Sequence, residues 1–193
     1  MKRLQMMVVL LVLSTGLWGC TAAGGSETAV SPPATHQPTN SPTARPTPIF
    51  RTAVPDACPI TQPPDPAFIP PKPHAAVPPN GEFWYGSNDL WTVLWPHGTW
   101  QQLPKSEDGY VNKLVWFREG YVWTEEEKPA LTVSARQLDG DGVVEPFTHA
   151  TNGFQEDYNS FMLAGIALPA LGCWEISGEY QGHILSYVVW VTP

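Results

Sequence analysis

Proline is concentrated in one stretch of this chain, and that concentration limits where a fold can form. Of the 22 prolines, 16 lie between residues 32 and 79, and six lie in the rest of the chain. Proline fixes φ and has no backbone N–H, so it interrupts helices and sheet ladders. We therefore expect the regular structure of this protein to begin after residue 80.

The proline-rich stretch divides into two parts by its apolar content. Residues 20–57 are rich in Pro and Thr and have few large apolar side chains, so burial does not offset the entropy lost on ordering. We predict a disordered tether that reaches up to roughly 115 Å in polyproline II. The second part, residues 58–80, has the apolar residues Cys58, Ile60, Phe68, Ile69 and Val77. For this part we predict an extended strap that lies on the folded domain and is attached to it through Cys58.

The N-terminus has the layout of a secretory signal. Lys2 and Arg3 precede a nearly unbroken apolar run over residues 4–13. This run is too short to span a bilayer comfortably as a permanent helix. We predict that residues 1–19 are a signal peptide that is removed on export.

The end of that signal is the sequence Leu17-Trp18-Gly19-Cys20, which resembles the lipobox of bacterial lipoproteins. Leu17, Gly19 and Cys20 match the lipobox, whereas Trp18 is bulkier than the residue usually found there. The resemblance implies that Cys20 is linked to diacylglycerol and that acyl chains such as palmitate anchor the protein to the extracytoplasmic face of the cell membrane. The alternative is a secreted protein in which Cys20 is free or disulfide-bonded.

The chain has three cysteines, an odd number for an exported protein. If Cys20 carries lipid, Cys58 and Cys173 are the remaining pair, and an oxidising compartment favours a disulfide between them. Such a bridge closes a loop of about 115 residues and contributes about 4–5 kcal/mol in the loop-entropy model. The alternative is two unpaired thiols.

Residues 81–193 have the pattern of an all-β domain. They contain eight of the nine tryptophans, in short segments rich in Val, Tyr, Trp and Thr that are separated by turn residues. We expect about eight to nine strands, including segments at 82–87, 90–95, 99–103, 110–119, 121–126, 130–139, 173–180 and 183–191. Segment 161–168 is a buried strand or a short helix. Turns at 96–98, Gly120, 139–142 and 181–182 predict hairpins.

These segments predict an antiparallel β-sandwich. With about 110 residues, a long-range cysteine pair and a Trp-bearing core, the domain resembles an immunoglobulin-like sandwich, although the cysteine spacing exceeds that of the usual inter-sheet bridge. The pattern FWYG…LW…KLVWFREGY…LTVSARQLDG…GCWEISGEYQGHILSYVVWV also resembles a group of uncharacterised bacterial lipoproteins. That resemblance implies no particular activity.

Charge and motifs exclude several functions. From residue 80 onward the chain has fifteen Asp and Glu against five Lys and Arg, a balance of −10, which disfavours nucleic acid and anionic lipid as partners.

The chain lacks a nucleophile elbow, a zincin helix, a phosphate loop and a C-x-x-C pair, and its five histidines are scattered. Residues 139–142 are predicted to be a turn and residues 125–127 a solvated loop tip, with calcium binding as the minority interpretation of each. We expect no metal or other cofactor.

Aromatic residues are the remaining candidates for binding. Trp174, Ile176 and Tyr180 share one strand face and are predicted to lie in the core. Trp84, Tyr85, Trp95 and Trp100 are the candidate binding aromatics. Of these, Trp84, Trp95 and Trp100 lie near turns and are the best candidates for partial exposure, although core packing is the favoured environment of any single tryptophan. We expect a non-enzymatic, membrane-tethered domain that binds an extracellular protein or contributes to envelope structure. The alternatives are a carbohydrate-binding module and an envelope hydrolase with a carboxylate pair.

Overall fold

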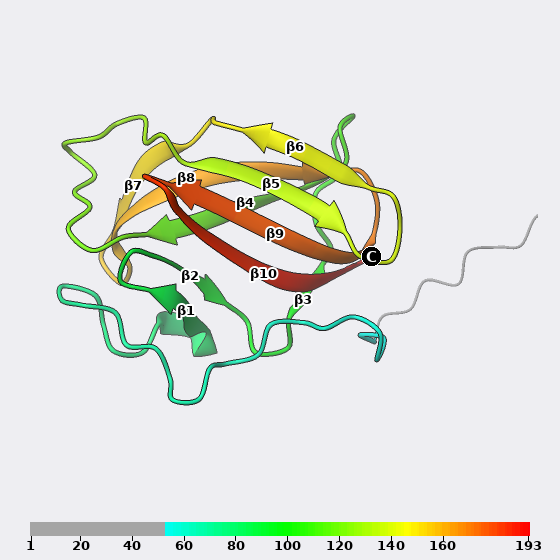
Figure 1. Ribbon diagram of the computed structural model, residues 1–193, viewed down its shortest axis with the longest axis horizontal. Coiled ribbons are helices and arrows are strands. Elements are labelled where there is room, and N and C mark those ends of the chain that lie inside the picture. The colour runs from blue at the N-terminus through cyan, green and yellow to red at the C-terminus, as the bar shows by residue number, and fades with distance from the viewer. Residues whose placement is uncertain (1–52) are drawn as a thin grey trace, which may run out of the picture. The chain divides into compact units, whose positions relative to one another are not determined.

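The computed structural model describes residues 53–193 (Figure 1). The predicted signal peptide at 1–19, the lipid-attachment residue Cys20 and most of the predicted tether at 20–57 lie outside the described residues. Within residues 53–193, the structure has no helix that is long and apolar enough to cross a membrane. The only helical element in this part is a short 3₁₀ helix, η1, at Pro79–Gly81.

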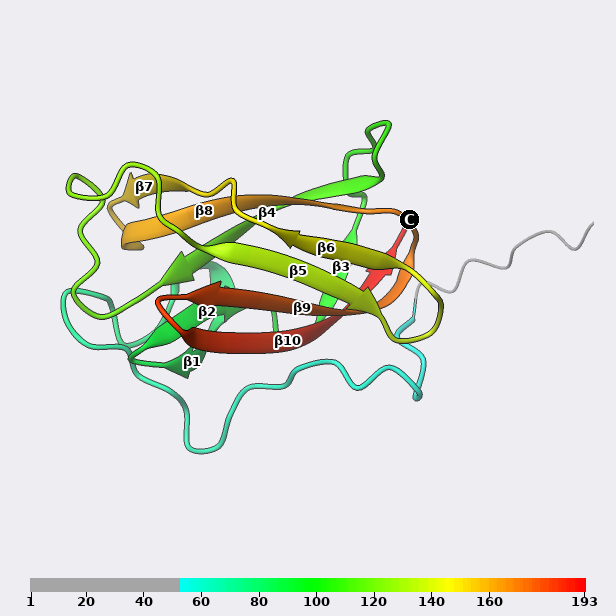
Figure 2. The same cartoon turned by 45° about the horizontal axis from the view of Figure 1, so that its top comes forward.

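Ten strands form two five-stranded sheets that pack face to face (Figures 1 and 2). In spatial order, the first sheet consists of β1 (Phe83–Ser87), β2 (Leu90–Leu94), β4 (Tyr110–Phe117), β8 (Asn159–Leu168) and β7 (Thr151–Gln155). The second consists of β3 (Thr99–Gln101), β10 (His183–Thr192), β9 (Gly172–Tyr180), β5 (Thr132–Gln137) and β6 (Val143–Phe147). Every neighbouring pair is antiparallel except β3 and β10, which are parallel. The predicted all-β sandwich is confirmed.

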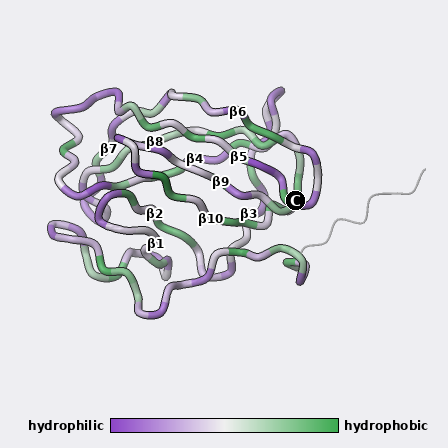
Figure 3. The backbone as a smooth tube through the Cα atoms, in the orientation of Figure 1, coloured by the Kyte–Doolittle hydropathy of each residue, from purple (hydrophilic) through white to green (hydrophobic). Residues whose placement is uncertain are grey.

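The main core lies between the two sheets and follows the alternation of side chains along the strands. In β8 every second residue is buried, from Ser160 to Leu168, which confirms the strand alternative for residues 161–168. From the second sheet, Trp174, Ile176 and Tyr180 are buried in the core, as predicted. Complete burial of one such large side chain contributes about 1.5–3 kcal/mol. The loop after β4 and the turn between β5 and β6 are mainly hydrophilic (Figure 3).

Gly178 of β9 allows the two sheets to approach closely. A Cβ atom at this position would lie 2.5 Å from the indole of Trp116, which is fully buried on the facing strand β4. Real Cβ contacts are not that short, and a packed core does not move aside cheaply. Glycine is therefore required at this position by the bulk of Trp116.

The structure confirms some of the predicted hairpins and contradicts others. β9 and β10 form the predicted hairpin across Gln181 and Gly182, which both have positive φ. Two other predictions are wrong. Residues 99–103 do not pair with residues 90–95, because the turn at 96–98 carries the chain to the second sheet, where β3 pairs with β10. Residues 121–126 form a loop, which the Tyr121 hydroxyl holds by donating to the Glu126 carbonyl at 3.1 Å. The sequence patterns also failed to predict β6 and β7.

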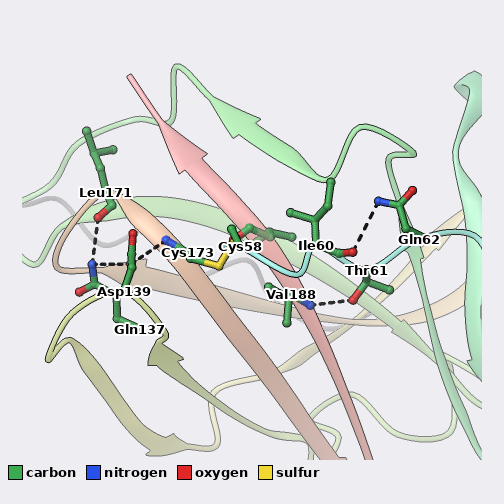
Figure 4. Close-up of a disulfide and its surroundings, with 10 residues drawn as sticks. Cys58, Ile60, Thr61, Gln62, Gln137, Asp139, Leu171, Cys173 and Val188 are labelled. Carbon is green, nitrogen blue, oxygen red and sulfur yellow. Dashed lines mark hydrogen bonds between the residues drawn. A yellow bond between two sulfur atoms is a disulfide. The ribbon is translucent and has the colours of Figure 1, made fainter. Parts of the chain in front are cut away.

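The predicted turn at 139–142 joins β5 to β6. The carboxylate of Asp139, its first residue, is hydrogen-bonded within the fold. Asp139 Oδ1 accepts the backbone N–H of Cys173 at 2.9 Å and the side-chain amide of Gln137 at 3.2 Å (Figure 4). The carboxylate therefore ties this turn to the start of β9. Within residues 53–193, no group of three or more His, Cys, Asp or Glu side chains is arranged to hold a metal ion.

The Cys58–Cys173 disulfide is present, as predicted, with Cα atoms 5.6 Å apart (Figure 4). It joins the chain before the first strand to the start of β9, so it does not link one sheet to the other as an immunoglobulin bridge does. Nearby, the Thr61 N–H donates to the Val188 carbonyl at 3.0 Å, and the Val188 N–H donates to Thr61 Oγ1 at 2.8 Å. These bonds hold the beginning of residues 58–80 against β10.

Further along, residues 58–80 cover an aromatic cluster on the outer face of the first sheet. Trp84, Trp91 and Phe117 form this cluster on β1, β2 and β4. Two side chains from the proline-rich segment pack onto it: the Phe68 ring lies 5.9 Å from the Trp91 ring, and the His74 ring lies 5.1 Å from it. At β1, β2 and β4 the first sheet is therefore covered on both faces, by the second sheet and by residues 58–80, which we call the strap.

Candidate functional site

A cleft opens in the first sheet where β2 separates from β4. The two strands pair at two positions only, Trp91 with Phe117 and Thr92 with Trp116. Beyond these pairs β2 stays with β1 and β4 stays with β8, so the strands diverge. Between them lies a cleft of about 510 Å³, with residues 93–95 on one side and residues 112–115 on the other. We call it the β2–β4 cleft.

The floor of the β2–β4 cleft is provided by the second sheet. Tyr187 of β10 lies there together with Trp100 and Leu103, and its ring centroid is 6.5 Å from that of Trp100. The Tyr187 side chain is 2% exposed, and within residues 53–193 its hydroxyl has no hydrogen-bond partner. Burial raises the pKa of this phenol, so the hydroxyl stays protonated and can donate. The hydroxyl oxygen itself is not fully enclosed, so it is open to the cleft and available to a ligand.

Trp95 lies at the mouth of the cleft and is 40% exposed. The His97 imidazole stacks on its indole with ring centroids 5.8 Å apart and an interplanar angle of 13°. His97 is positioned in turn by the backbone N–H of Thr99, which donates to its Nδ1 at 3.2 Å. The stacking orients the Trp95 ring although much of it is open to solvent.

A hydrogen-bonded pair, Glu82 and Tyr158, lies at the outer side of the cleft. The Tyr158 hydroxyl donates to the Glu82 carboxylate. Burial raises the pKa of Glu82, and the hydrogen bond from Tyr158 partly opposes that effect. Burial and then the Glu82 carboxylate raise the pKa of Tyr158 to about 12, so it remains a neutral donor at neutral pH. Glu82 is the one carboxylate in the described lining of the cleft.

Amide side chains complete the polar part of the lining. Gln101 is exposed on β3, and Asn112 is half-buried on β4. Asn112 Oδ1 accepts the backbone N–H of Lys113 at 2.8 Å. Within the described part of the chain its amide NH₂ has no partner. The cleft thus combines aromatic rings with side chains that both donate and accept hydrogen bonds.

The structure separates the four candidate binding aromatics. Trp95 and Trp100 line the cleft, whereas Tyr85 packs against the main core and lines a different groove. Trp84, a candidate for partial exposure, is instead 2% exposed, because the strap covers it and the Ala75 carbonyl accepts its indole N–H at 3.0 Å; the core-packing alternative holds for this residue. A turn near a tryptophan does not imply exposure when a distant segment lies over the ring.

Five of the polar residues assigned to the cleft were not predicted from the sequence, namely Glu82, Gln101, Asn112, Tyr158 and Tyr187. Alternation along residues 183–191 places Tyr187 on the same strand face as Val189 and Val191, which are core positions. That pattern identifies an inward-facing tyrosine. The pattern does not show that β2 and β4 diverge above the Tyr187 ring.

A second groove, of about 600 Å³, lies between the strap and two hairpins. It is lined by Phe68 and Ile69 of the strap, by Tyr85 and Asp89 near the β1–β2 turn, and by Ile184 of β10. Ile69 and Ile184 are largely exposed there. The second groove has an apolar rim, in contrast to the mixed lining of the β2–β4 cleft.

Comparisons with known proteins do not assign this chain to a family. No family model matches it, and no curated protein or solved structure matches it either. The function is therefore inferred from the geometry and the charge of the described residues, together with the motif at the N-terminus.

Proposed function

We propose that this protein is a lipid-anchored, extracytoplasmic lipoprotein whose β-sandwich binds a ligand in the β2–β4 cleft without catalysing a reaction. The lipobox match of Leu17, Gly19 and Cys20 supports the anchor. The disulfide supports it as well, because pairing of Cys58 with Cys173 leaves Cys20 as the one cysteine to be accounted for. Two or more acyl chains on Cys20 would hold the protein stably at a membrane surface.

One observation carries the binding proposal: the hydroxyl of Tyr187, which has no partner within residues 53–193, opens into the floor of a cleft that has an exposed tryptophan at its mouth. Ligand sites are typically concave, mostly apolar and fitted with a few polar groups that orient the ligand. The β2–β4 cleft has this composition. A ligand group that hydrogen-bonds to Tyr187 would give its hydroxyl a partner within the cleft.

The lining supports binding over glycoside hydrolysis. Hydrolysis by the usual mechanisms needs two carboxyl groups, held about 5–5.5 Å apart or about 6.5–9.5 Å apart. In the described lining Glu82 is the one carboxyl group, and it is hydrogen-bonded to Tyr158. We therefore assign Glu82 the role of a hydrogen-bonding group at the outer side of the cleft.

The anchor is tested by mass spectrometry of the mature protein expressed in a bacterial host. We expect the N-terminal residue to be Cys20 carrying a diacylglycerol thioether, and the protein to enter the detergent phase on temperature-induced phase separation. Cys20→Ala is the matched variant and should lack the modification. An unmodified Cys20, or a mature N-terminus elsewhere, would contradict the anchor.

The cleft is tested with residues 21–193, which lack Cys20 but retain the disulfide, the strap and both sheets. Its tryptophan fluorescence is titrated with three classes of probe: uncharged oligosaccharides, extended peptides and anionic polysaccharides. We expect at least one class to give a saturable change that Trp95→Ala abolishes. Trp123→Ala is the control, because Trp123 is 38% exposed but lies outside the cleft. If every saturable change persists in Trp95→Ala, or if no probe binds, the cleft is not a ligand site.

A further inference from the structure

The chemistry of the β2–β4 cleft restricts the class of ligand. The Trp95 indole presents an oriented aromatic surface at the mouth. Sugar rings have an apolar face of C–H groups that packs on the negative face of an aromatic ring. Phosphates and carboxylates have no such face. The mouth of the cleft is therefore suited to a sugar ring or another flat apolar group.

The hydrogen-bonding groups of the cleft match hydroxyl groups. The phenol of Tyr187 and the amides of Gln101 and Asn112 each offer a donor and an acceptor, and Glu82 offers acceptors. A sugar hydroxyl also donates and accepts, so it pairs with any of these groups in more than one orientation. Purely apolar ligands would leave the Tyr187 hydroxyl without a partner.

Charge disfavours ionic ligands. The charged side chains in the described lining are Glu82 and Lys113, which have opposite signs, so neither an anion nor a cation finds a surplus of opposite charge there. The surrounding domain has a balance of −10 from residue 80 onward and repels polyanions. An uncharged ligand incurs no such repulsion.

The backbone of β4 disfavours an extended peptide, the other ligand class that fits an open sheet. A peptide added as a strand would bond to backbone groups along the β4 edge that faces the cleft. Three of these groups already have partners: the Val111 N–H donates to the Pro104 carbonyl at 2.8 Å, the Lys113 N–H donates to Asn112 Oδ1, and the Val115 carbonyl accepts the Thr92 hydroxyl at 2.7 Å. The side chains of the cleft therefore offer a ligand more hydrogen-bonding groups than the backbone of β4 does.

We infer that the β2–β4 cleft binds an uncharged glycan, with a sugar ring on Trp95 and a hydroxyl group hydrogen-bonded to Tyr187. This inference rests on the proposed binding function of the cleft and specifies its ligand class. Trp95 supplies the stacking surface, and Tyr187 selects ligands that bring a hydroxyl group to the floor. Gln101 and Asn112 supply further hydrogen bonds at the sides.

The inference is tested by calorimetry on residues 21–193 with an array of uncharged oligosaccharides derived from β-glucan, xylan and mannan. We expect saturable binding to at least one of them. Tyr187→Phe removes the hydroxyl alone and should weaken binding by about two- to tenfold, the effect of one hydrogen bond. Trp95→Ala should weaken it more than tenfold. Trp123→Ala should leave it unchanged, and urea unfolding of each variant shows whether the fold is retained.

Polygalacturonate and an uncharged extended peptide serve as the competing probes. The glycan assignment is overturned if no uncharged oligosaccharide binds, if polygalacturonate binds more tightly than all of them, or if Tyr187→Phe and Trp95→Ala bind like the wild type. Binding of the peptide alone, lost in Trp95→Ala, would overturn the glycan assignment but leave the proposed binding function standing. Failure of every probe would contradict both.

Discussion

Removal of the Cys58–Cys173 disulfide should destabilise the domain more than any single change on its surface. The bridge connects residues 115 positions apart, so in the unfolded chain it closes a loop of that length. The chain-entropy model gives about 4–5 kcal/mol for a loop of this size. A domain is typically stable by about 5–15 kcal/mol, so the bridge supplies a large share of the total.

The double variant Cys58→Ala, Cys173→Ala tests this magnitude by urea unfolding, followed by tryptophan fluorescence. With a denaturant slope of about 2 kcal/mol/M, loss of the loop closure alone should lower the midpoint by about 2–2.5 M. Both cysteines are buried, so their replacement by alanine adds a small packing loss of about 1 kcal/mol. Reduced wild-type protein is the control, because it loses the covalent constraint but keeps both thiols.

The bridge also holds the beginning of the strap against β9 and β10, next to the bonds between Thr61 and Val188. Its loss should therefore increase the amide exchange of residues 58–61 before that of the sheets. If the free energy of unfolding of both the reduced protein and the double variant stays within about 1 kcal/mol of the oxidised wild type, loop closure does not supply this stability.

Three further predictions concern packing and pH. Gly178→Ala should cost about 1–3 kcal/mol in urea unfolding because of the facing indole, whereas Gly165→Ala, which has open space, should have little effect. Burial lowers the pKa of His74 below 6.5, so the folded protein favours the neutral imidazole. The free energy of unfolding should therefore fall as pH decreases below about 6.5. His74→Phe should show a weaker pH dependence of its unfolding midpoint. Trp84→Ala should cost about 3–5 kcal/mol in thermal unfolding, against no more than about 2 kcal/mol for Trp95→Ala; similar losses would contradict the coverage by the strap.

The elements that were predicted correctly have local signals. The β9–β10 hairpin has two β-rich arms and a two-residue turn ending in glycine, so its pairing needs no information from elsewhere in the chain. The core positions of β9 follow from alternation alone. The disulfide could be predicted because lipidation of Cys20 would leave a single possible pair.

The incorrect predictions involve partners that are distant in sequence. β3 has only three residues, and nothing in its sequence shows that it pairs in parallel with β10. Trp84 is covered by a proline-rich segment whose path over the sheet is set by Phe68 and His74. The cleft depends on the short pairing between β2 and β4, a property of strand geometry that no residue pattern encodes.

Hydrogen–deuterium exchange of residues 21–193, with and without a saturating uncharged oligosaccharide, shows which surface of the domain the glycan occupies. If the glycan lies in the β2–β4 cleft, we expect slower exchange at residues 93–95 of the β2 side and 112–115 of the β4 side, and no change in the strap around Ile69. Protection confined to the groove that contains Ile69 and Ile184, or no protection at saturation, would contradict the assignment of the β2–β4 cleft as the ligand site.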